Sequence, residues 1–272
     1  MLKSLRNSVR KELMIVEGHP ALLVEKPKRA VVVADLHLGF EMDLRLRGVR
    51  IPSHSGRLLD ELKEIVEKTK ADQVIVAGDL KHNILGPSEL ESKVLPMFLE
   101  ELNKHVERVM IIPGNHDGRL VQVLKGLAEI LPTRGIYIPE ERLAITHGHV
   151  KPDDKLVNAR LVIAGHLHPV LRLGSGDAGA RLRVWLRLRA SRKSLLRALY
   201  GKQARDVRGE LSLLIMPSFN PFLQGRSVND LGPSRLVRGP LLHSGVFDVD
   251  MAEVMTLDGK VLGRLGELRK VL

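Results

Sequence analysis

The chain has 272 residues, enough for one large α/β domain or at most two small ones, and it carries a formal net charge of +11. The absence of cysteine excludes disulfides and thiolate metal sites, so a metal ion would have to take histidine, asparagine and carboxylate ligands. No apolar run approaches the ~20 residues that span a bilayer, and residues 1–11 lack the apolar core of a secretory signal. We therefore expect a cytoplasmic protein that does not cross a membrane.

The first half of the chain alternates predicted strands with predicted helices. Short apolar stretches at 13–17 and 21–25 predict a hairpin or an edge pair. Buried strands are predicted where short apolar runs end abruptly, at 30–34, 74–77, 109–112, 143–146 and 161–164. Helices are predicted where apolar residues recur at helical spacing, at 53–70, 88–105 and 119–130. This alternation is typical of a mainly parallel, layered α/β domain.

Capping signals mark the starts of two of these helices. Ser53 or Ser55 is available as the N-cap of the first, and Ser88 with Glu91 has the spacing of a capping box on the second. Between the first strand and the first helix, residues 39–52 are mixed and charged, and they predict a loop or short helix overhanging the strand ends.

The second half of the chain is richer in predicted strands. Residues 181–189 alternate with period two, which places Trp185 and four arginines on one face of a strand, namely Arg181, Arg183, Arg187 and Arg189. A short basic helix is predicted over 191–205, and further strands are predicted at 211–216, 246–249, 254–257 and 260–265. We therefore expect a second sheet that packs on the first. We expect a single domain over 1–272, with a basic strand–helix insertion at about 172–208.

The positive charge is concentrated in that insertion. Residues 172–208 hold eleven Lys or Arg against Asp177 and Asp206, whereas the rest of the chain is close to neutral. A cluster of unopposed cations suits a polyanion, so we expect the arginine face of 181–189 to contact nucleic acid. The alternative is a solvated sheet surface with ion pairs. Trp185 is more typical of packing than of base stacking.

Polar side chains follow five of the predicted strands directly. Because parallel strands of an α/β sheet place ligand sites beyond their carboxyl ends, these side chains should converge. They are Asp35 and His37, Asp79, Asn115 and His116, His147, and finally His166 and His168.

This set predicts a metal site. Seven of these side chains have a free lone pair for a cation, more than one ion usually takes, so we expect two divalent ions that share Asp79. Manganese is the expected metal, with iron, zinc or magnesium as alternatives. Two such ions serve phosphoester hydrolysis, and a neighbouring histidine that is not a ligand could protonate the leaving alkoxide.

The motifs Asp35-x-His37, Gly78-Asp79, Gly114-Asn115-His116-Asp117, His147 and Gly165-His166-x-His168 together resemble, over residues 35–168, the signature of the calcineurin-like metallophosphoesterases. The resemblance implies a four-layer α/β/β/α sandwich that holds two divalent ions. It implies a first ion held by Asp35, His37, Asp79 and His168, and a second held by Asp79, Asn115, His147 and His166. His116 would be the acid or transition-state stabiliser, oriented by Asp117. We expect His149 to fix His147 through a hydrogen bond.

Two further segments suggest a branch of that family. His82, three positions beyond Asp79, is similar to a substrate-positioning histidine of the nuclease subunit of double-strand-break repair complexes. Residues 35–41 and 217–221 look like the ICC-like, DNA-ligase-associated phosphoesterases. This resemblance implies a role in DNA repair with repair-protein partners. The chain is too short for the DNA-capping domain of those repair nucleases, which argues against processive duplex degradation.

These observations predict a hydrolase, namely a two-metal phosphodiesterase or nuclease that acts on DNA or RNA. The alternative enzyme is a hydrolase of small or cyclic nucleotides. A non-catalytic nucleic-acid-binding adaptor is the alternative of another class, and the complete ligand set argues against it.

Overall fold

Five strands form the first sheet, in the order β1-β2-β3-β4-β5. The neighbours β2 (Ala30–Val33), β3 (Gln73–Val76) and β4 (Arg108–Ile111) are parallel, β1 (Leu22–Val24) is antiparallel at one edge, and β5 (Glu129–Ile130) lies at the other. The central strands are buried almost throughout because both faces of the sheet are covered. This computed structural model describes residues 14–46, 48–49, 54–84, 88, 91–124, 126–174, 179–201, 207–223, 225–230 and 239–271.

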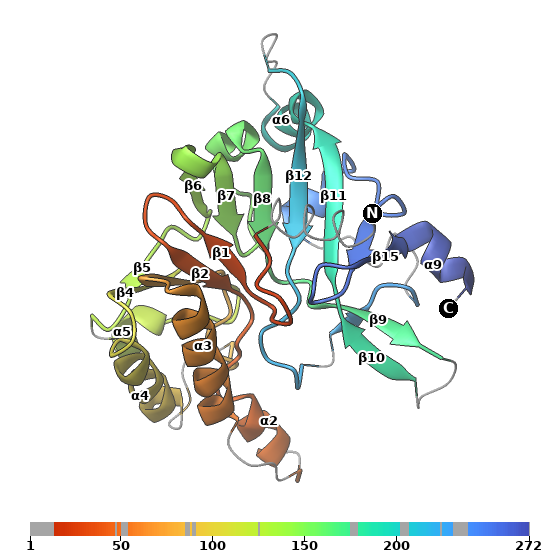
Figure 1. Ribbon diagram of the computed structural model, residues 1–272. Helices are drawn as coiled ribbons and strands as arrows, with labels where there is room; N and C mark the ends of the chain where they lie inside the picture. Colours follow the sequence, from red (N-terminus) through yellow and green to blue (C-terminus); the bar gives the residue numbers. More distant parts are fainter. Residues whose placement is uncertain are drawn as a thin grey trace.

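Helices α3 (Ser55–Thr69) and α4 (Glu91–Leu102) cover the outer face of this sheet (Figure 1). Their apolar stripes pack on the valines of β2 and β3, as the helical spacing predicts. The short helix α2 (Phe40–Leu46) precedes them, in the segment predicted as a loop or short helix.

The caps of these helices differ from each other. The capping box is confirmed, because Glu91 N donates to Ser88 Oγ at 3.2 Å and Ser88 N donates to Glu91 Oε2 at 2.7 Å. The N-cap of α3 is instead His54, which makes no capping hydrogen bond, and Ser55 Oγ donates to Glu41. Ser53 lies outside the described residues.

The helix predicted over 119–130 is shorter than its pattern. Of the residues described in this range, α5 (Leu120–Leu124) forms the helix, and Gly126 has a φ of 85°, outside the helical region. Beyond it, residues 129–130 form β5, which pairs with β4. The pairing with a distant strand outweighs the local helical spacing.

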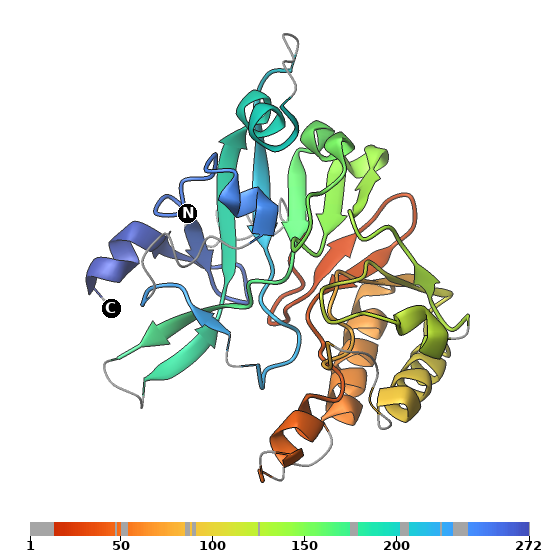
Figure 2. The same cartoon turned by 180° about the vertical axis from the view of Figure 1, so that it is seen from behind.

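The second sheet has seven strands in the order β15-β14-β11-β12-β8-β7-β6. Its parallel centre is β7 (Leu143–Thr146), β8 (Leu161–Ala164) and β12 (Glu210–Ile215), beside the antiparallel β11 (Trp185–Ser191). The remaining strands are β6 (Ile136–Ile138), β14 (Glu253–Met255) and β15 (Val261–Arg264), and residues 246–249, predicted as a strand, are irregular. Its outer face carries η2 (Asp154–Asn158), α6 (Arg192–Tyr200), α8 (Gly239–His243) and α9 (Leu265–Val271) (Figure 2).

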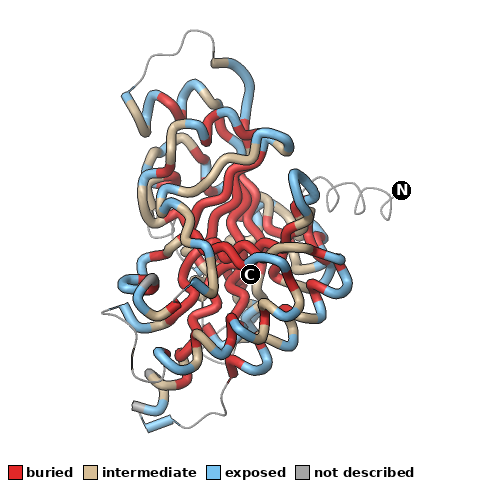
Figure 3. Tube along the Cα trace, turned by 90° about the vertical axis from the view of Figure 1, so that its left-hand side faces the viewer, coloured by how far each residue is buried: buried red, intermediate tan, exposed pale blue. Residues whose placement is uncertain are grey.

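The two sheets pack face to face. Val32, Ile75 and Met110 of the first sheet meet Ile163 and the fully buried Trp185 of the second in one apolar cluster. Figure 3 shows the buried residues gathered in these central layers and the exposed ones on the outer helices. The expected four-layer α/β/β/α sandwich is confirmed, and Trp185 is a packing residue.

The predicted basic strand over 181–189 is two strands in two sheets. Residues of β10 (Ala180–Arg183) pair with β9 (Pro169–Leu173) in a small third sheet that is completed by β13 (Arg226–Ser227). After Val184 the chain enters β11 of the second sheet.

No helix within the described part of the chain combines the length and apolar character that a membrane crossing requires. The division of the chain into one domain with an insertion at about 172–208 stays a prediction.

Candidate metal centre

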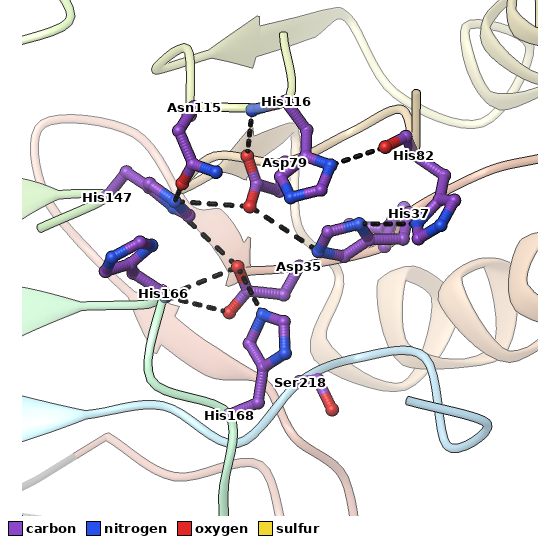
Figure 4. Close-up of polar contacts among 12 residues, drawn as sticks. Asp35, His37, Asp79, His82, Asn115, His116, His147, His166, His168 and Ser218 are labelled. Carbon is purple, nitrogen blue, oxygen red and sulfur yellow. Dashed lines mark hydrogen bonds and ion pairs between the residues drawn. The ribbon is translucent and has the colours of Figure 1, made fainter. Parts of the chain in front are cut away.

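The polar loops that follow five strands converge on one site between the two sheets (Figure 4). The first sheet contributes the loops after β2, β3 and β4, and the second contributes those after β7 and β8. The side chains of all seven residues predicted as ligands meet there, namely Asp35, His37, Asp79, Asn115, His147, His166 and His168.

Asp79 lies at the centre of this group. Its Oδ2 is 3.4 Å from His37 Nε2 and also 3.4 Å from His147 Nε2. Among the described residues, three sets of metal-type side chains have ligand atoms within 4.8 Å of one another. One consists of the histidines His37, His82 and His116, and the other two contain carboxylates and share Asp79. Of the two sets with carboxylates, the first is Asp35, His37, Asp79 and His168, and the second is Asp79, His147 and His166.

Asp35 joins the two sheets at the site. Its Oδ1 lies 3.2 Å from His168 Nε2, and its Oδ2 accepts a hydrogen bond of 3.1 Å from His166 N. Asn115, from the β4 loop, points its Oδ1 at His147 Nε2 over 3.2 Å. Oxygen and nitrogen lone pairs from both sheets therefore face the same space.

Five of these residues have a left-handed backbone. The φ values are 59° at Asp35, 46° at His37, 51° at Asp79, 71° at His166 and 48° at His168. A non-glycine residue in this region is uncommon and costs roughly 1–3 kcal/mol, so such residues persist where the surrounding structure enforces them. This backbone conformation turns the chain sharply at the end of each strand and directs the side chain that follows into the site.

Gly114 allows the β4 loop to approach Asp79. A Cβ at Gly114 would lie 2.1 Å from Asp79 Oδ1 and 2.5 Å from Asp79 N, which is far inside contact distance. We expect Gly114→Ala to displace the carboxylate, weaken metal binding and destabilise the fold by about 1–3 kcal/mol. Gly56→Ala is the matched control because its Cβ meets nothing within 4 Å in helix α3, and it should stabilise by about 0.5–1 kcal/mol. Thermal melts and metal titrations measure both, and equal effects of the two changes would contradict the expectation.

Burial and the two carboxylates set the protonation of the histidines. Burial lowers the pKa of His37 to about 3 although Asp79 opposes it, and burial with the charge of His147 lowers that of His166 to about 4. Burial also acts on His147, but its hydrogen bond to Asp79 and the charge of that carboxylate outweigh it and raise the pKa to about 9. Burial acts to raise the pKa of Asp79, but the hydrogen bond and charge of His147, with the charge of His37, hold it well below its ordinary value.

The donor atoms fit divalent cations. His147 Nδ1 lies 3.0 Å from Ala77 O, and because a carbonyl only accepts, Nδ1 carries the hydrogen and Nε2 is left for a ligand bond. His37 Nε2 and His168 Nε2 are buried and have no hydrogen-bond partner among the described residues. A cation would satisfy these nitrogen atoms. His149, expected to hydrogen-bond His147, instead packs edge-on against its ring at 5.0 Å between centroids.

His116 and Asp117 have different surroundings. His116 N donates to Asp79 Oδ1 at 2.8 Å, and His116 Nδ1 donates to the carbonyl oxygen of His82. The Asp117 carboxylate bonds main-chain amides and not this ring, and its role in orienting His116 stays a prediction. Asp117 is buried, and its carboxylate accepts hydrogen bonds from Gly114 N at 2.8 Å and Lys81 N at 3.2 Å, so it fixes two loops. Burial and the charge of Asp79 raise the pKa of Asp117.

His82 borders the first set of ligands. Its Nδ1 lies 3.2 Å from His37 Nδ1, and its ring is roughly parallel to that of His116 with 5.6 Å between centroids. The sequence did not predict that two further side chains are buried near these residues. Lys81 Nζ donates to the His116 carbonyl, and Ser218 lies beside His168 (Figure 4). Sequence reasoning also missed that Glu91, recognised only as a cap, accepts hydrogen bonds from the His82 loop.

The predicted arginine face is not formed. Arg183 donates to the carbonyls of Ser218 and Phe219, and Arg187 is buried with Glu253 at 3.7 Å. Arg181 and Arg189 are exposed but belong to different sheets. Arg189 pairs in register with Ser212, which in turn pairs with Leu161 at the start of β8. Arg189 therefore lies at the end of the sheet opposite the metal ligands, and helix α6 lies at this same end (Figure 1). The alternation of apolar and charged residues holds in each half of the segment, but it does not show that the chain passes from one sheet to another between Arg183 and Trp185.

Comparison with known proteins agrees with this geometry. The family model of the calcineurin-like phosphoesterases matches residues 28–170, more than half of the 272 residues. The SbcD component of the nuclease SbcCD from Staphylococcus epidermidis is 33% identical over 92 residues, which are 34% of this chain and 23% of that protein, so the match spans less than a quarter of that relative. The crystal structure of Pseudomonas putida nuclease MPE has the same fold, with a TM-score of 0.50 at 18% identity over 89% of this chain and 98% of that one. The chain therefore belongs to the calcineurin-like phosphoesterase family, and it is a metal-dependent phosphoesterase.

Proposed function

We propose that this phosphoesterase uses two divalent ions to hydrolyse phosphodiester bonds in DNA or RNA. The observation that carries the proposal is the position of Asp79 Oδ2, 3.4 Å from a histidine of each ligand set. A single carboxylate between two sets of donors could be shared by two ions, which in two-metal sites usually lie about 3.5–4 Å apart.

The contacts support two proposed ligand sets. Asp35, His37, Asp79 and His168 would hold one ion, and Asp79, Asn115, His147 and His166 the other. When bound, such ions supply Lewis-acid stabilisation of the phosphoryl group and lower the pKa of a nearby water. Nitrogen and oxygen ligands without sulfur suit manganese, and iron, zinc or magnesium share this preference.

His116 is proposed as the general acid. Its Nδ1 is bonded to the His82 carbonyl, which leaves Nε2 as the atom that can reach a substrate. The step begins with His116 as an imidazolium, with hydrogen on both ring nitrogens. As a water oxygen bonds to phosphorus and the bond to the leaving oxygen breaks, the water releases a proton to solvent, the leaving oxygen takes the Nε2 proton of His116, and the ring is left neutral with its hydrogen on Nδ1. The products are a phosphomonoester and an alcohol. His82 is proposed to help position the substrate phosphate beside His116.

Nucleic acid is the proposed substrate class. The support is the similarity of part of this chain to the SbcD component of the nuclease SbcCD. A role in DNA repair, repair-protein partners and a cytoplasmic location belong to the same proposal. Arg181 is exposed on β10. The same strand brings Arg183 into register with Val170, which lies two residues beyond His168. This end of the basic segment is therefore the proposed substrate contact.

A substrate panel tests the proposal. With manganese added, we expect turnover of bis-p-nitrophenyl phosphate and of short DNA or RNA, and slower turnover of a cyclic nucleotide and of a phosphomonoester. A preference for the cyclic nucleotide would replace the nuclease by a small-nucleotide hydrolase. Metal-dependent binding of oligonucleotide without any turnover would favour an adaptor.

Metal binding should depend on pH through His147. Because the pKa of His147 is raised to about 9, the metal-free protein carries this proton at pH 7 and has to release it before the ring can bind a cation. We therefore expect apparent metal affinity to rise with pH up to about 9 and then to flatten. Calorimetry in buffers of different ionisation enthalpy measures the release, and binding without proton release at pH 7 would contradict the expectation.

A further inference from the structure

Lys81 is a buried lysine for which the proposed reaction has no use. Its side chain is 0% exposed, and its Nζ donates hydrogen bonds to two main-chain carbonyl oxygens, those of Asn83 and His116. Since both acceptors are protein carbonyls and the ammonium group is shielded from solvent, Lys81 is not placed to touch a substrate. An ammonium group is costly to bury unless hydrogen bonds and nearby carboxylates compensate it, so this position calls for an explanation.

The two acceptors of Lys81 belong to loops on different strands. Asn83 follows β3, and His116 follows β4. Across the same gap His116 Nδ1 donates to His82 O, one residue before Asn83. The lysine therefore holds together the two segments whose separation decides whether the His116 ring keeps its hydrogen bond.

Glu91 fixes the same segment from the other side. This carboxylate is 1% exposed, and its Oε1 accepts from His82 N at 3.0 Å and from Asn83 N at 2.8 Å. Its Oε2 accepts from Ser88 N at 2.7 Å, which ties it to the start of α4. The His82–Asn83 segment is thus held by a buried cation through a carbonyl and by a buried anion through two amides.

The result is a fixed acceptor for the His116 ring. His116 is also held at its amide, which donates to Asp79 Oδ1 at 2.8 Å. With the amide, the carbonyl and Nδ1 all bonded, the ring orientation is determined and Nδ1 keeps its hydrogen, so the proton that the imidazolium form gives up is the one on Nε2. Side chains that orient a catalytic histidine in this way change rates without contacting the substrate.

We propose that Lys81, assisted by Glu91, is a positioning residue for His116: its buried ammonium group clamps the loops after β3 and β4 so that the His82 carbonyl aims His116 Nε2 at the leaving oxygen. The inference rests on the proposed function for the role of His116. Its own content is the clamp, which exists whether or not the substrate is nucleic acid.

Leaving-group dependence tests the clamp. The leaving group of a dinucleotide is an alkoxide, which needs a proton as it departs. In Lys81→Met, kcat on a dinucleotide should therefore fall about 10–100-fold with KM unchanged. On bis-p-nitrophenyl phosphate, whose leaving group departs without a proton, kcat should stay within about threefold of wild type. In a His116→Ala background Lys81→Met should have no further effect on the dinucleotide. Lys104→Met, at an exposed lysine of the α4 end, is the matched control and should change neither rate.

Equal losses on both substrates, or additive losses in the double variant, would overturn the proposal. If Lys81→Met does not fold, Glu91→Gln acts on the same segment and should give the same selective loss. A second readout does not need turnover: ¹⁵N NMR of the His116 imidazole should show hydrogen on Nδ1 in the wild type and a mixture of tautomers in the variant. An unchanged tautomer would refute the clamp, whereas a wild type that hydrolyses neither diester would refute the proposed function alone.

Discussion

Asp79→Asn is expected to reduce turnover of bis-p-nitrophenyl phosphate by roughly 10³-fold or more, because several kcal/mol of charge stabilisation depend on the shared carboxylate. The change keeps the shape of the side chain and removes the charge that lies 3.4 Å from His37 Nε2 and from His147 Nε2. The amide nitrogen cannot replace a carboxylate oxygen as a ligand. Metal content should fall together with activity.

The control for this change is Asp60→Asn, which removes an exposed carboxylate from α3. Its activity and metal content should equal those of the wild type. Steady-state kinetics and metal analysis of both variants check the prediction. If Asp79→Asn retained full activity with two bound ions, Asp79 would not be the bridging group.

His116→Ala is expected to lower kcat on a dinucleotide by about 10²–10⁴-fold, the usual contribution of a general acid. The loss on bis-p-nitrophenyl phosphate should be much smaller, since p-nitrophenolate leaves without a proton. Two bound ions should remain, because His116 reaches Asp79 only through its main-chain amide.

His105→Ala is the matched control for this second change. His105 lies just beyond α4, and its ion-pair partner is Glu101, with 3.9 Å between His105 Nε2 and Glu101 Oε1. Kinetics on the two substrates should be unchanged by it. Equal losses on both substrates in His116→Ala would show that this histidine stabilises the transition state in another way than by giving a proton.

The convergence of the ligands could be predicted from the sequence because it follows from a general property of sheets. Parallel strands bring their carboxyl ends to one edge, so Asp35 and Asp79, which follow adjacent strands, have to lie near each other. The second sheet adds His147 and His166 in the same way, after the parallel strands β7 and β8. The four layers follow once the apolar strands need cover on both faces.

The direction of a loop side chain could not be predicted in this way. Asp117 was expected at the His116 ring, but its carboxylate faces the amides of Gly114 and Lys81, and the second of these lies on another strand's loop. The contacts of Lys81 and Glu91 with the His82–Asn83 segment could not be predicted either, because these partners are main-chain atoms that the sequence does not distinguish. Such contacts depend on how two loops approach in space.

Anomalous diffraction from a crystal grown with manganese can show directly whether two ions share the Asp79 carboxylate. We expect two manganese peaks, one on each side of the Asp79 carboxylate, with His37 beside one and His147 beside the other. A single peak, or two peaks that do not share Asp79, would contradict this expectation.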